Sequence, residues 1–222
     1  MYHYELVNNH YIVEINGRKY LLDTGCGGSL IRRGEPIVIN GKAYGQNRLP
    51  EQVASEMSKF IGVDIDGLIG SEVVLNNGLT IYKNGNLEFA TLENGGDNIV
   101  PLINRGGRLS IEGTVSPTIK GQILIDTGAK YGYGDFRSAF TRENMCEHIH
   151  DFNPNPRLGY FDSYAYAVKV IINNHEYNLK LGDSDKVNMY CLSYGYKAVI
   201  NITDLFNEYC VFDINNHRLV LK

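Results

Sequence analysis

The sequence predicts a mostly β protein built from two similar halves. The chain has 24 glycines and 16 tyrosines in 222 residues. Asn-Gly and Asn-Asn pairs separate several short apolar segments, a pattern typical of strands joined by tight turns. Most tellingly, the segment 20–25 (YLLDTG) recurs almost unchanged as 123–128 (ILIDTG). In both copies a short apolar run, typical of a buried strand, ends in Asp-Thr-Gly.

The first copy follows a predicted β-hairpin. Residues 11–15 and 18–22 flank Asn16-Gly17, and this dipeptide favours a two-residue hairpin turn. In the second half, residues 109–111 and 119–125 are expected to form the hairpin that leads into Asp126. Further turns of this kind are predicted at Asn40-Gly41, Asn84-Gly85 and Asn173-Asn174.

Helix is predicted over residues 50–61. Pro50 suits the first helical position, the apolar residues recur with helical spacing, and Gly62 ends the segment. Shorter helical turns are expected after Ser71 and at residues 203–206. Another helix is expected to start at Asp135 and to run as far as Met145.

Downstream segments of the two halves also align. Residues 67–70 (GLIG) correspond to residues 198–201 (AVIN), and residues 87–89 correspond to residues 219–221. Features that recur in the same order indicate an internal duplication. The polar, Gly-containing segment 94–98 has the composition of a linker. The predicted organisation is an N-terminal lobe over 1–93, a linker over 94–98 and a C-terminal lobe over 99–222.

Composition limits the partners and the compartment. The net charge of −4 argues against nucleic acid or an anionic membrane as a partner. Every apolar run is too short to span a bilayer, and the N-terminus does not resemble a signal peptide. The four cysteines are irregularly spaced, which favours reduced thiols in a cytoplasmic protein and no metal site.

The repeated carboxylates are the candidate functional residues. An unpaired buried carboxylate is energetically costly. A fold that builds the same costly turn twice is therefore expected to bring Asp23 and Asp126 together.

On these motifs the chain resembles single-chain aspartic proteases of the pepsin and retropepsin superfamily. The resemblance rests on the two Asp-Thr-Gly motifs and on the downstream apolar segments, and it covers nearly the whole chain. It implies an acid-protease fold with two pseudo-twofold-related, β-barrel-like lobes and a few short helices. It further implies that Thr24 and Thr127 hydrogen-bond across the lobe boundary, and that the chain is a monomer because it contains both lobes.

The resemblance implies an aspartic endopeptidase that hydrolyses a peptide or protein substrate. Asp23 and Asp126 would be catalytic, sharing a proton and activating a water molecule between them. Neither a cofactor nor a metal would be required. The residues expected to support the catalytic pair are Thr24, Gly25, Cys26, Thr127, Gly128 and Ala129.

The sequence departs from the family pattern at three places. Cys26 and Ala129 stand where pepsin-like enzymes usually have hydroxyl residues, so the pair is expected to titrate higher and to work at weakly acidic to neutral pH. Asn201 replaces the second downstream Gly. The first lobe is also too short for a flap. The flap is instead expected around 157–166, with Tyr160, Phe161 and Tyr164 as candidate substrate contacts.

Alternative interpretations remain open. The two Asp residues could simply cap turns, or the chain could be a catalytically silent peptide-binding or scaffold protein on the same fold. Cys26 could act in redox chemistry or serve as a small buried apolar residue. His148 and His150 suggest a metal, although no third ligand is evident and a solvated position explains them more simply.

Overall fold

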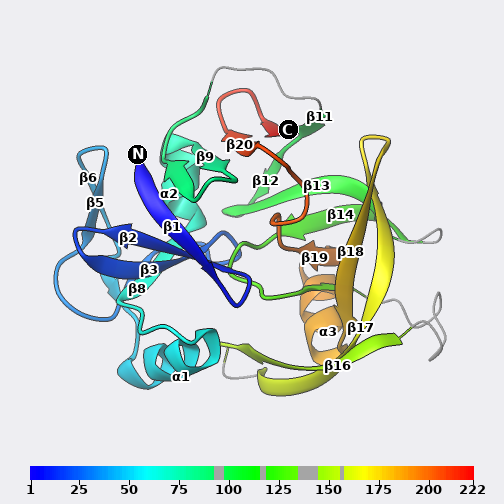
Figure 1. Cartoon of the computed structure of the whole chain (residues 1–222), viewed down its shortest axis with the longest axis horizontal. Helices are drawn as coiled ribbons and strands as arrows, with labels where there is room; N and C mark the ends of the chain where they lie inside the picture. The colour runs from blue at the N-terminus through cyan, green and yellow to red at the C-terminus, as the bar shows by residue number, and fades with distance from the viewer. Residues whose placement is uncertain (93–97, 116–118, 135–144, 156–157) are drawn as a thin grey trace.

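The computed structural model describes residues 1–222 except 93–97, 116–118, 135–144 and 156–157. The described residues form sheets of eleven, eight and two strands together with three helices (Figure 1). This confirms the predicted mostly β class.

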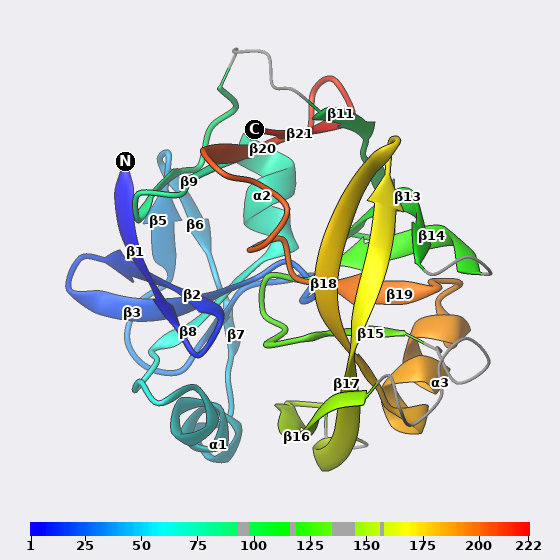
Figure 2. The same ribbon diagram turned by 45° about the vertical axis from the view of Figure 1, so that its right-hand side comes forward.

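The eleven-stranded sheet combines first-half strands with three from the second half. Figure 2 shows β11, β20 and β21 on the upper side of the molecule, where the two halves meet. In spatial order the sheet contains β11 (Asn98–Pro101), β21 (Arg218–Leu221), β20 (Tyr209–Asp213), β9 (Leu79–Tyr82), β10 (Asn86–Glu88), β1 (Tyr2–Val7), β2 (His10–Ile15), β3 (Arg18–Asp23), β8 (Gly67–Gly70), β4 (Leu30–Ile31) and β7 (Asn47–Arg48).

The eight-stranded sheet belongs to the second half. Its strands in spatial order are β12 (Ile103–Arg105), β13 (Arg108–Val115), β14 (Ile119–Ile125), β19 (Ala198–Ile200), β15 (Gly132–Gly134), β18 (His175–Asp183), β17 (Gly159–Ile172) and β16 (Met145–Asn153). The two-stranded sheet consists of β5 (Ile37–Ile39) and β6 (Lys42–Tyr44).

The two halves repeat one local arrangement. The strand before each Asp-Thr-Gly motif pairs in parallel with the downstream apolar strand of the same half: β3 with β8, and β14 with β19. Leu22 lies opposite Ile69, and Ile125 lies opposite Ile200. The segments that align in the sequence are therefore neighbours in space.

The predicted Asn-containing turns are confirmed. Ile15 pairs with Arg18 across the first turn, where Asn16 and Gly17 have φ values of 52° and 72°. Two consecutive positive φ values define the hairpin turn whose twist matches the flanking strands. Equivalent two-residue turns lie at residues 40–41 and 173–174. The turn at Asn84-Gly85 is one residue longer, because Tyr82 pairs with Asn86, and only Gly85 has a positive φ there.

The helices agree only partly with the sequence-based predictions. Helix α1 (Glu51–Ile61) follows Pro50 and ends at Gly62, whose φ of 91° provides a left-handed cap. Helix α2 (Ser71–Asn77) matches the turn expected after Ser71. Helix α3 (Asp185–Ser193) was not predicted.

The helical segment expected at residues 203–206 does not form, and the helix expected from Asp135 is not tested. Residues 203–206 form a turn in place of the expected helical segment, closed by the Leu205 N–H donating to the Ile202 carbonyl at 2.9 Å. The helix expected from Asp135 falls on residues 135–144, outside the described part of the chain. Met145, its expected end, is the first residue of strand β16.

The apolar core is shared by both halves. One cluster of buried side chains contains Leu22 and Ile69 from the first half and Ile125 and Ile200 from the second. A smaller cluster joins the buried face of α1 to the first sheet, and Phe152 of β16 packs against it. Burial of apolar surface therefore holds the two halves together.

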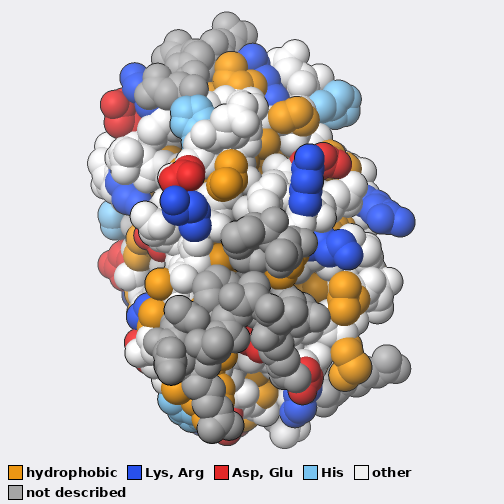
Figure 3. Space-filling model, turned by 90° about the vertical axis from the view of Figure 1, so that its right-hand side faces the viewer, with side chains coloured by type: hydrophobic (Ala, Val, Ile, Leu, Met, Phe, Trp, Pro, Cys, Tyr) orange, Lys and Arg blue, Asp and Glu red, His pale blue; other side chains and the backbone are white. Residues whose placement is uncertain are grey.

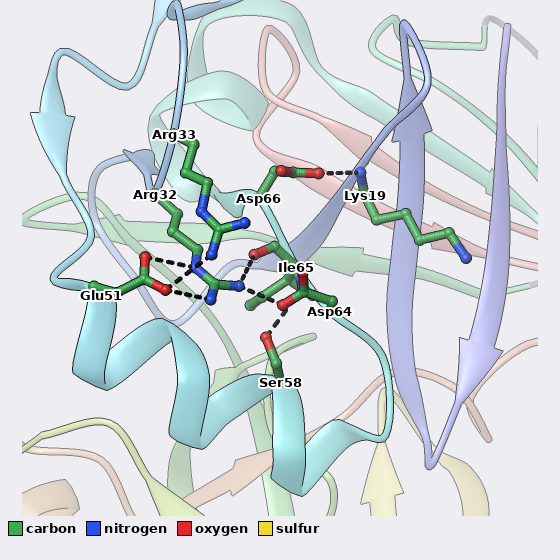
Figure 4. Close-up of polar contacts among 8 residues, drawn as sticks. All are labelled: Lys19, Arg32, Arg33, Glu51, Ser58, Asp64, Ile65 and Asp66. Carbon is green, nitrogen blue, oxygen red and sulfur yellow. Dashed lines mark hydrogen bonds and ion pairs between the residues drawn. The ribbon is translucent and has the colours of Figure 1, made fainter.

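The buried guanidinium of Arg32, the residue directly after β4, connects this part of the chain to α1 and to the loop before β8 (Figure 4). Arg32 exposes only 6% of its side chain and pairs with Glu51 at 2.5 Å and with Asp64. It also donates to the Ile65 carbonyl at 3.2 Å, while the Ile65 N–H donates to the Ser58 hydroxyl at 3.1 Å. These contacts fix how α1 packs on the first half.

We predict that Arg32→Met lowers the melting temperature clearly more than Arg33→Met does. Arg33 contacts the same Glu51 at 2.9 Å, but 57% of its side chain is exposed, and exposed ion pairs contribute little. Thermal unfolding of both variants tests this. Equal losses would show that Arg32 acts only as one more surface charge.

Candidate functional site

The two Asp-Thr-Gly turns form in the same way. Strand β3 ends at Asp23, and the Cys26 N–H donates to the Asp23 carbonyl at 3.2 Å. In the second half the Ala129 N–H donates to the Asp126 carbonyl at 3.3 Å. Each turn leaves its carboxyl group beside the other half of the molecule.

Thr24 and Thr127 join the two turns by four reciprocal hydrogen bonds. The Thr24 N–H donates to the Thr127 hydroxyl at 3.1 Å, and the Thr127 N–H donates to the Thr24 hydroxyl at 3.0 Å. The Thr24 hydroxyl donates to the Ile125 carbonyl at 2.9 Å, and the Thr127 hydroxyl donates to the Leu22 carbonyl at 2.7 Å. Both residues are fully buried. We call this arrangement the threonine clamp.

Glycine is required where the turns meet. A Cβ on Gly25 would lie 2.3 Å from Asp126 Oδ2, and a Cβ on Gly128 would lie 2.5 Å from Asp23 Cγ. No side chain fits at such distances. Each glycine thus lets the opposite carboxyl group approach the backbone.

Asp23 and Asp126 hydrogen-bond to each other. Asp23 Oδ1 also accepts the Cys26 N–H at 2.9 Å, and Asp126 Oδ1 accepts the Gly128 N–H at 2.9 Å. Burial, followed by repulsion from Asp126, raises the pKa of Asp23 well above its ordinary value. Burial also raises the pKa of Asp126. The arrangement favours a pair that holds one proton.

A cavity of about 440 Å³ opens beside this carboxyl pair. Both halves line it, and most of its lining is apolar. The first half contributes Asp23, Gly25, Cys26, Leu30, Leu49, Pro50, Val53 and Leu68. The second contributes Leu124, Asp126, Gly128, Ala129, Lys130, Tyr133, Asp151, Phe152, Asn153, Pro154, Asn155, Phe161, Val187 and Val199.

Cys26 and Ala129, which stand where pepsin-like enzymes usually have hydroxyl residues, both line this cavity. The Cys26 thiol donates to the Gly28 carbonyl at 3.1 Å, and burial raises its pKa to about 12. A thiol in this state is neutral and unreactive at ordinary pH. The carbonyl of Ala129 accepts a hydrogen bond from Asn201 Nδ2 at 2.7 Å.

Asn201 has a clear role where the pattern has Gly. Its amide nitrogen also donates to the Asn9 carbonyl at 3.0 Å, and its oxygen accepts the Thr203 N–H at 3.0 Å. The side chain therefore ties the second Asp-Thr-Gly turn to the turn between β1 and β2.

Among the described residues of the predicted flap, only Phe161 lines the cavity. Tyr160 and Tyr164 are 43% and 47% exposed.

The Tyr160 hydroxyl donates to Glu56 Oε2 on α1 at 3.0 Å. Phe152 packs against both Tyr160 and Phe60, with ring centroids 4.7 Å and 6.0 Å apart. The β16–β17 hairpin thus meets α1 of the first half. Arg157, at the start of the predicted flap, lies outside the described residues.

Sequence reasoning missed Asp151 in the cavity wall. Its side chain is 4% exposed and accepts hydrogen bonds from the Tyr133 hydroxyl and, at 2.8 Å, from the Phe152 N–H. Burial raises its pKa. The alternation of exposed His148 and His150 with buried Ile149 and Asp151 is a strand pattern that could have revealed it.

The two histidines lie on the outer face of the same hairpin. His148 Nε2 and His150 Nδ1 approach Asp162 Oδ1 at 3.6 Å and 3.0 Å, and all three side chains are more than half exposed. Within the described ranges, no group of three or more His, Cys, Asp or Glu residues is arranged to hold a metal.

Charges of both signs are mixed on the described part of the face drawn in Figure 3, where lysine and arginine lie among acidic and apolar side chains. The helices of the described residues include none that is long and apolar enough to cross a membrane.

Two solved structures are similar to this chain in fold at low sequence identity. No protein-family model and no curated protein matches the chain. The solved structure of basic 7S globulin from soybean matches with a TM-score of 0.51 and 7% identity, over 96% of this chain and 91% of that one. Conglutin gamma, a basic 7S globulin from lupine seeds, matches with a TM-score of 0.40 and 14% identity, over 70% of this chain and 56% of that one.

These comparisons correct the sequence-based identification. The soybean structure, which matches over nearly the whole chain, is a basic 7S globulin and not an aspartic protease. The predicted membership of that protease superfamily, the endopeptidase activity and the assignment as a hydrolase are therefore wrong. The physical reason is that an Asp-Thr-Gly repeat specifies two joined turns, whereas a fold does not by itself specify an activity. Because the predicted hydrolysis is wrong, the expected pH optimum for it no longer applies.

We predict that Thr24→Val and Thr127→Val each destabilise the protein by roughly 2–4 kcal/mol. Each removes a hydroxyl that both donates and accepts, leaving a buried N–H and a buried C=O without partners. Because the two residues share one network, the double variant should lose clearly less than the sum of the single losses. Chemical denaturation provides the measurement, and additive losses would contradict the clamp.

The carboxyl pair predicts a pH dependence of stability. A carboxyl group whose pKa is raised by folding stabilises the folded state at pH values below its ordinary pKa, which is 3.8 for Asp23. This contribution is lost as the pH rises through the raised pKa. The melting temperature of Asp23→Asn should therefore rise relative to that of the native chain as the pH increases from 3.8 through the raised pKa of Asp23, by roughly 2–4 °C for each kcal/mol.

Thermal unfolding of both proteins across this pH range provides the measurement. If the difference between Asp23→Asn and the native chain stayed constant with pH, the raised pKa of Asp23 would be refuted.

Proposed function

We propose that the protein binds peptides without cleaving them, and that the cavity beside the carboxyl pair holds an extended polypeptide segment. The observation that carries this proposal is the cavity of about 440 Å³, lined by both halves and mostly apolar, with two paired carboxyl groups in its wall. Concave apolar sites with a few convergent polar groups are the usual form of ligand sites.

The carboxyl pair suits main-chain recognition. A pair that holds one proton offers one O–H donor together with several acceptor lone pairs. A peptide group presents one C=O acceptor and one N–H donor. Asp23 and Asp126 can therefore satisfy a peptide group of the ligand inside an otherwise apolar cavity, where unsatisfied polar groups are costly.

The proposal extends to the finer architecture. We propose that the chain forms two pseudo-twofold-related lobes of a pepsin-like fold and uses them for binding. The two equivalent parallel strand pairs, β3–β8 and β14–β19, support this proposal. The lobes would correspond to residues 1–93 and 99–222, joined through 94–98. We further propose that the chain acts as a monomer, because one chain supplies both walls of the cavity.

The β16–β17 hairpin would cover the bound segment. Phe152 and Phe161 line the cavity, and Tyr160 reaches Glu56 on the opposite side. In this proposal Phe161 contacts the ligand, whereas Tyr160 and Tyr164 act outside the cavity.

We predict that Val53→Trp weakens peptide binding at least tenfold, because an indole at this position on α1 would fill part of the cavity. Gln52→Trp is the matched control, since Gln52 is an exposed neighbour on the same helix that does not line the cavity. Fluorescence anisotropy with a pool of labelled, extended peptides provides the measurement.

Mass spectrometry of the recovered peptides should find them intact. Equal binding by both tryptophan variants would place the ligand elsewhere on the surface. Peptide scission that is lost in Asp23→Asn would refute a function limited to binding.

A further inference from the structure

Asp151 is a third buried carboxyl group in the wall of the cavity, and it is separate in the sequence from the Asp-Thr-Gly motifs. It lies on β16 with 4% of its surface exposed. Tyr133, Phe152 and Phe161, which also line the cavity, surround this part of the wall. A carboxyl group at such a place requires an explanation, because burial of a charge without a counterion is unfavourable.

The carboxyl group is held in a fixed orientation. Its Oδ1 accepts the Phe152 N–H at 2.8 Å, and its Oδ2 accepts the Tyr133 hydroxyl. Phe161 packs edge-on against Tyr133, with ring centroids 5.6 Å apart, and so supports the tyrosine. A carboxylate has about four acceptor positions. Two hydrogen bonds therefore orient Asp151 and leave it able to accept more.

No described cation neutralises Asp151. The described ion pairs do not include this residue, and its charge interacts with Lys130 and His150 only at longer range. The Lys130 ammonium lies over the rings of Phe60 and Tyr131, at 5.7 Å and 5.1 Å from their centroids. Within the described chain the position beside Asp151 is thus available to a cation from outside.

The rest of the cavity suits the stem of a long basic side chain. Leu124, Val187 and Val199 are apolar residues of the second half that line the same cavity. Lysine and arginine bury their methylene stems against apolar surfaces while the charged end reaches a polar partner. An apolar wall that ends in an oriented carboxylate is the complement of such a side chain.

We propose that Asp151 selects a lysine or arginine side chain of the bound peptide. This inference rests on the proposed function, since it concerns the same cavity. It adds the chemical class of the ligand: an extended segment with a basic residue directed into the second-half side of the cavity.

The test uses sets of peptides with one fixed sequence. In each set a single position carries lysine, norleucine or glutamate, and that position is moved along the peptide from one set to the next. Norleucine keeps the apolar stem and removes the charge. At one position the native protein should bind lysine at least about tenfold more tightly than norleucine. In Asp151→Asn that preference should disappear, whereas binding of the norleucine peptide should be retained.

Asp162→Asn is the matched control, because this carboxylate lies on the exposed face of the same hairpin. It should leave the preference for lysine unchanged. Equal affinities for lysine and norleucine at every position, or a preference that survives in Asp151→Asn, would overturn the assignment while leaving peptide binding intact.

A second measurement does not require a peptide. The carboxyl ¹³C resonance of Asp151 should shift on titration with n-butylammonium and not with n-butanol. Absence of the shift would overturn the inference. Absence of binding by any peptide, together with a normal n-butylammonium shift, would instead count against the proposed function alone.

Discussion

The structure depends on the threonine clamp. Each hydroxyl donates to a carbonyl at the end of the opposite strand and accepts the opposite backbone N–H, with distances of 2.7–3.1 Å. Both side chains are fully buried, so loss of either would leave polar groups without water. Because the clamp fixes the two turns, it also fixes Asp23 and Asp126 against each other. The cavity lies where these turns meet.

Local turn chemistry could be read from the sequence. Asn16-Gly17 adopts the positive φ values that its hairpin requires, and the turns at Asn40-Gly41 and Asn173-Asn174 follow the same rule. The repeated motif predicted the juxtaposition of the two carboxyl groups, because a buried carboxylate needs a partner. Helix α1 was predictable because Pro50 and Gly62 mark both of its ends.

Other features depend on contacts that the sequence does not display. Strands β20 and β21 belong to the second half but extend the sheet of the first, a pairing that no local pattern specifies. Among the described side chains of helix α3, the apolar residues that are buried are Val187 and Cys191, so the periodicity of the helix is weak. The alternation around Asp151 indicates a strand, but the place of Asp151 in the cavity wall depends on the pairing of β16 with β17.

The correction of the predicted activity follows from the same distinction. The Asp-Thr-Gly repeat determines backbone geometry: a strand end, a tight turn and a glycine at a close approach. These constraints are satisfied whether or not the carboxyl pair performs chemistry. What distinguishes one function from another lies in the surrounding wall, where Cys26 and Ala129 provide no hydroxyl and Asp151 adds a third acid.

The most direct test of the central claim is amide hydrogen exchange, measured by NMR with and without a saturating basic peptide. Bound peptide should slow exchange at the Cys26 and Gly128 amides, which donate to the carboxyl pair, and at the Phe152 amide, which donates to Asp151. Unchanged exchange at all three amides in the presence of bound peptide would contradict it.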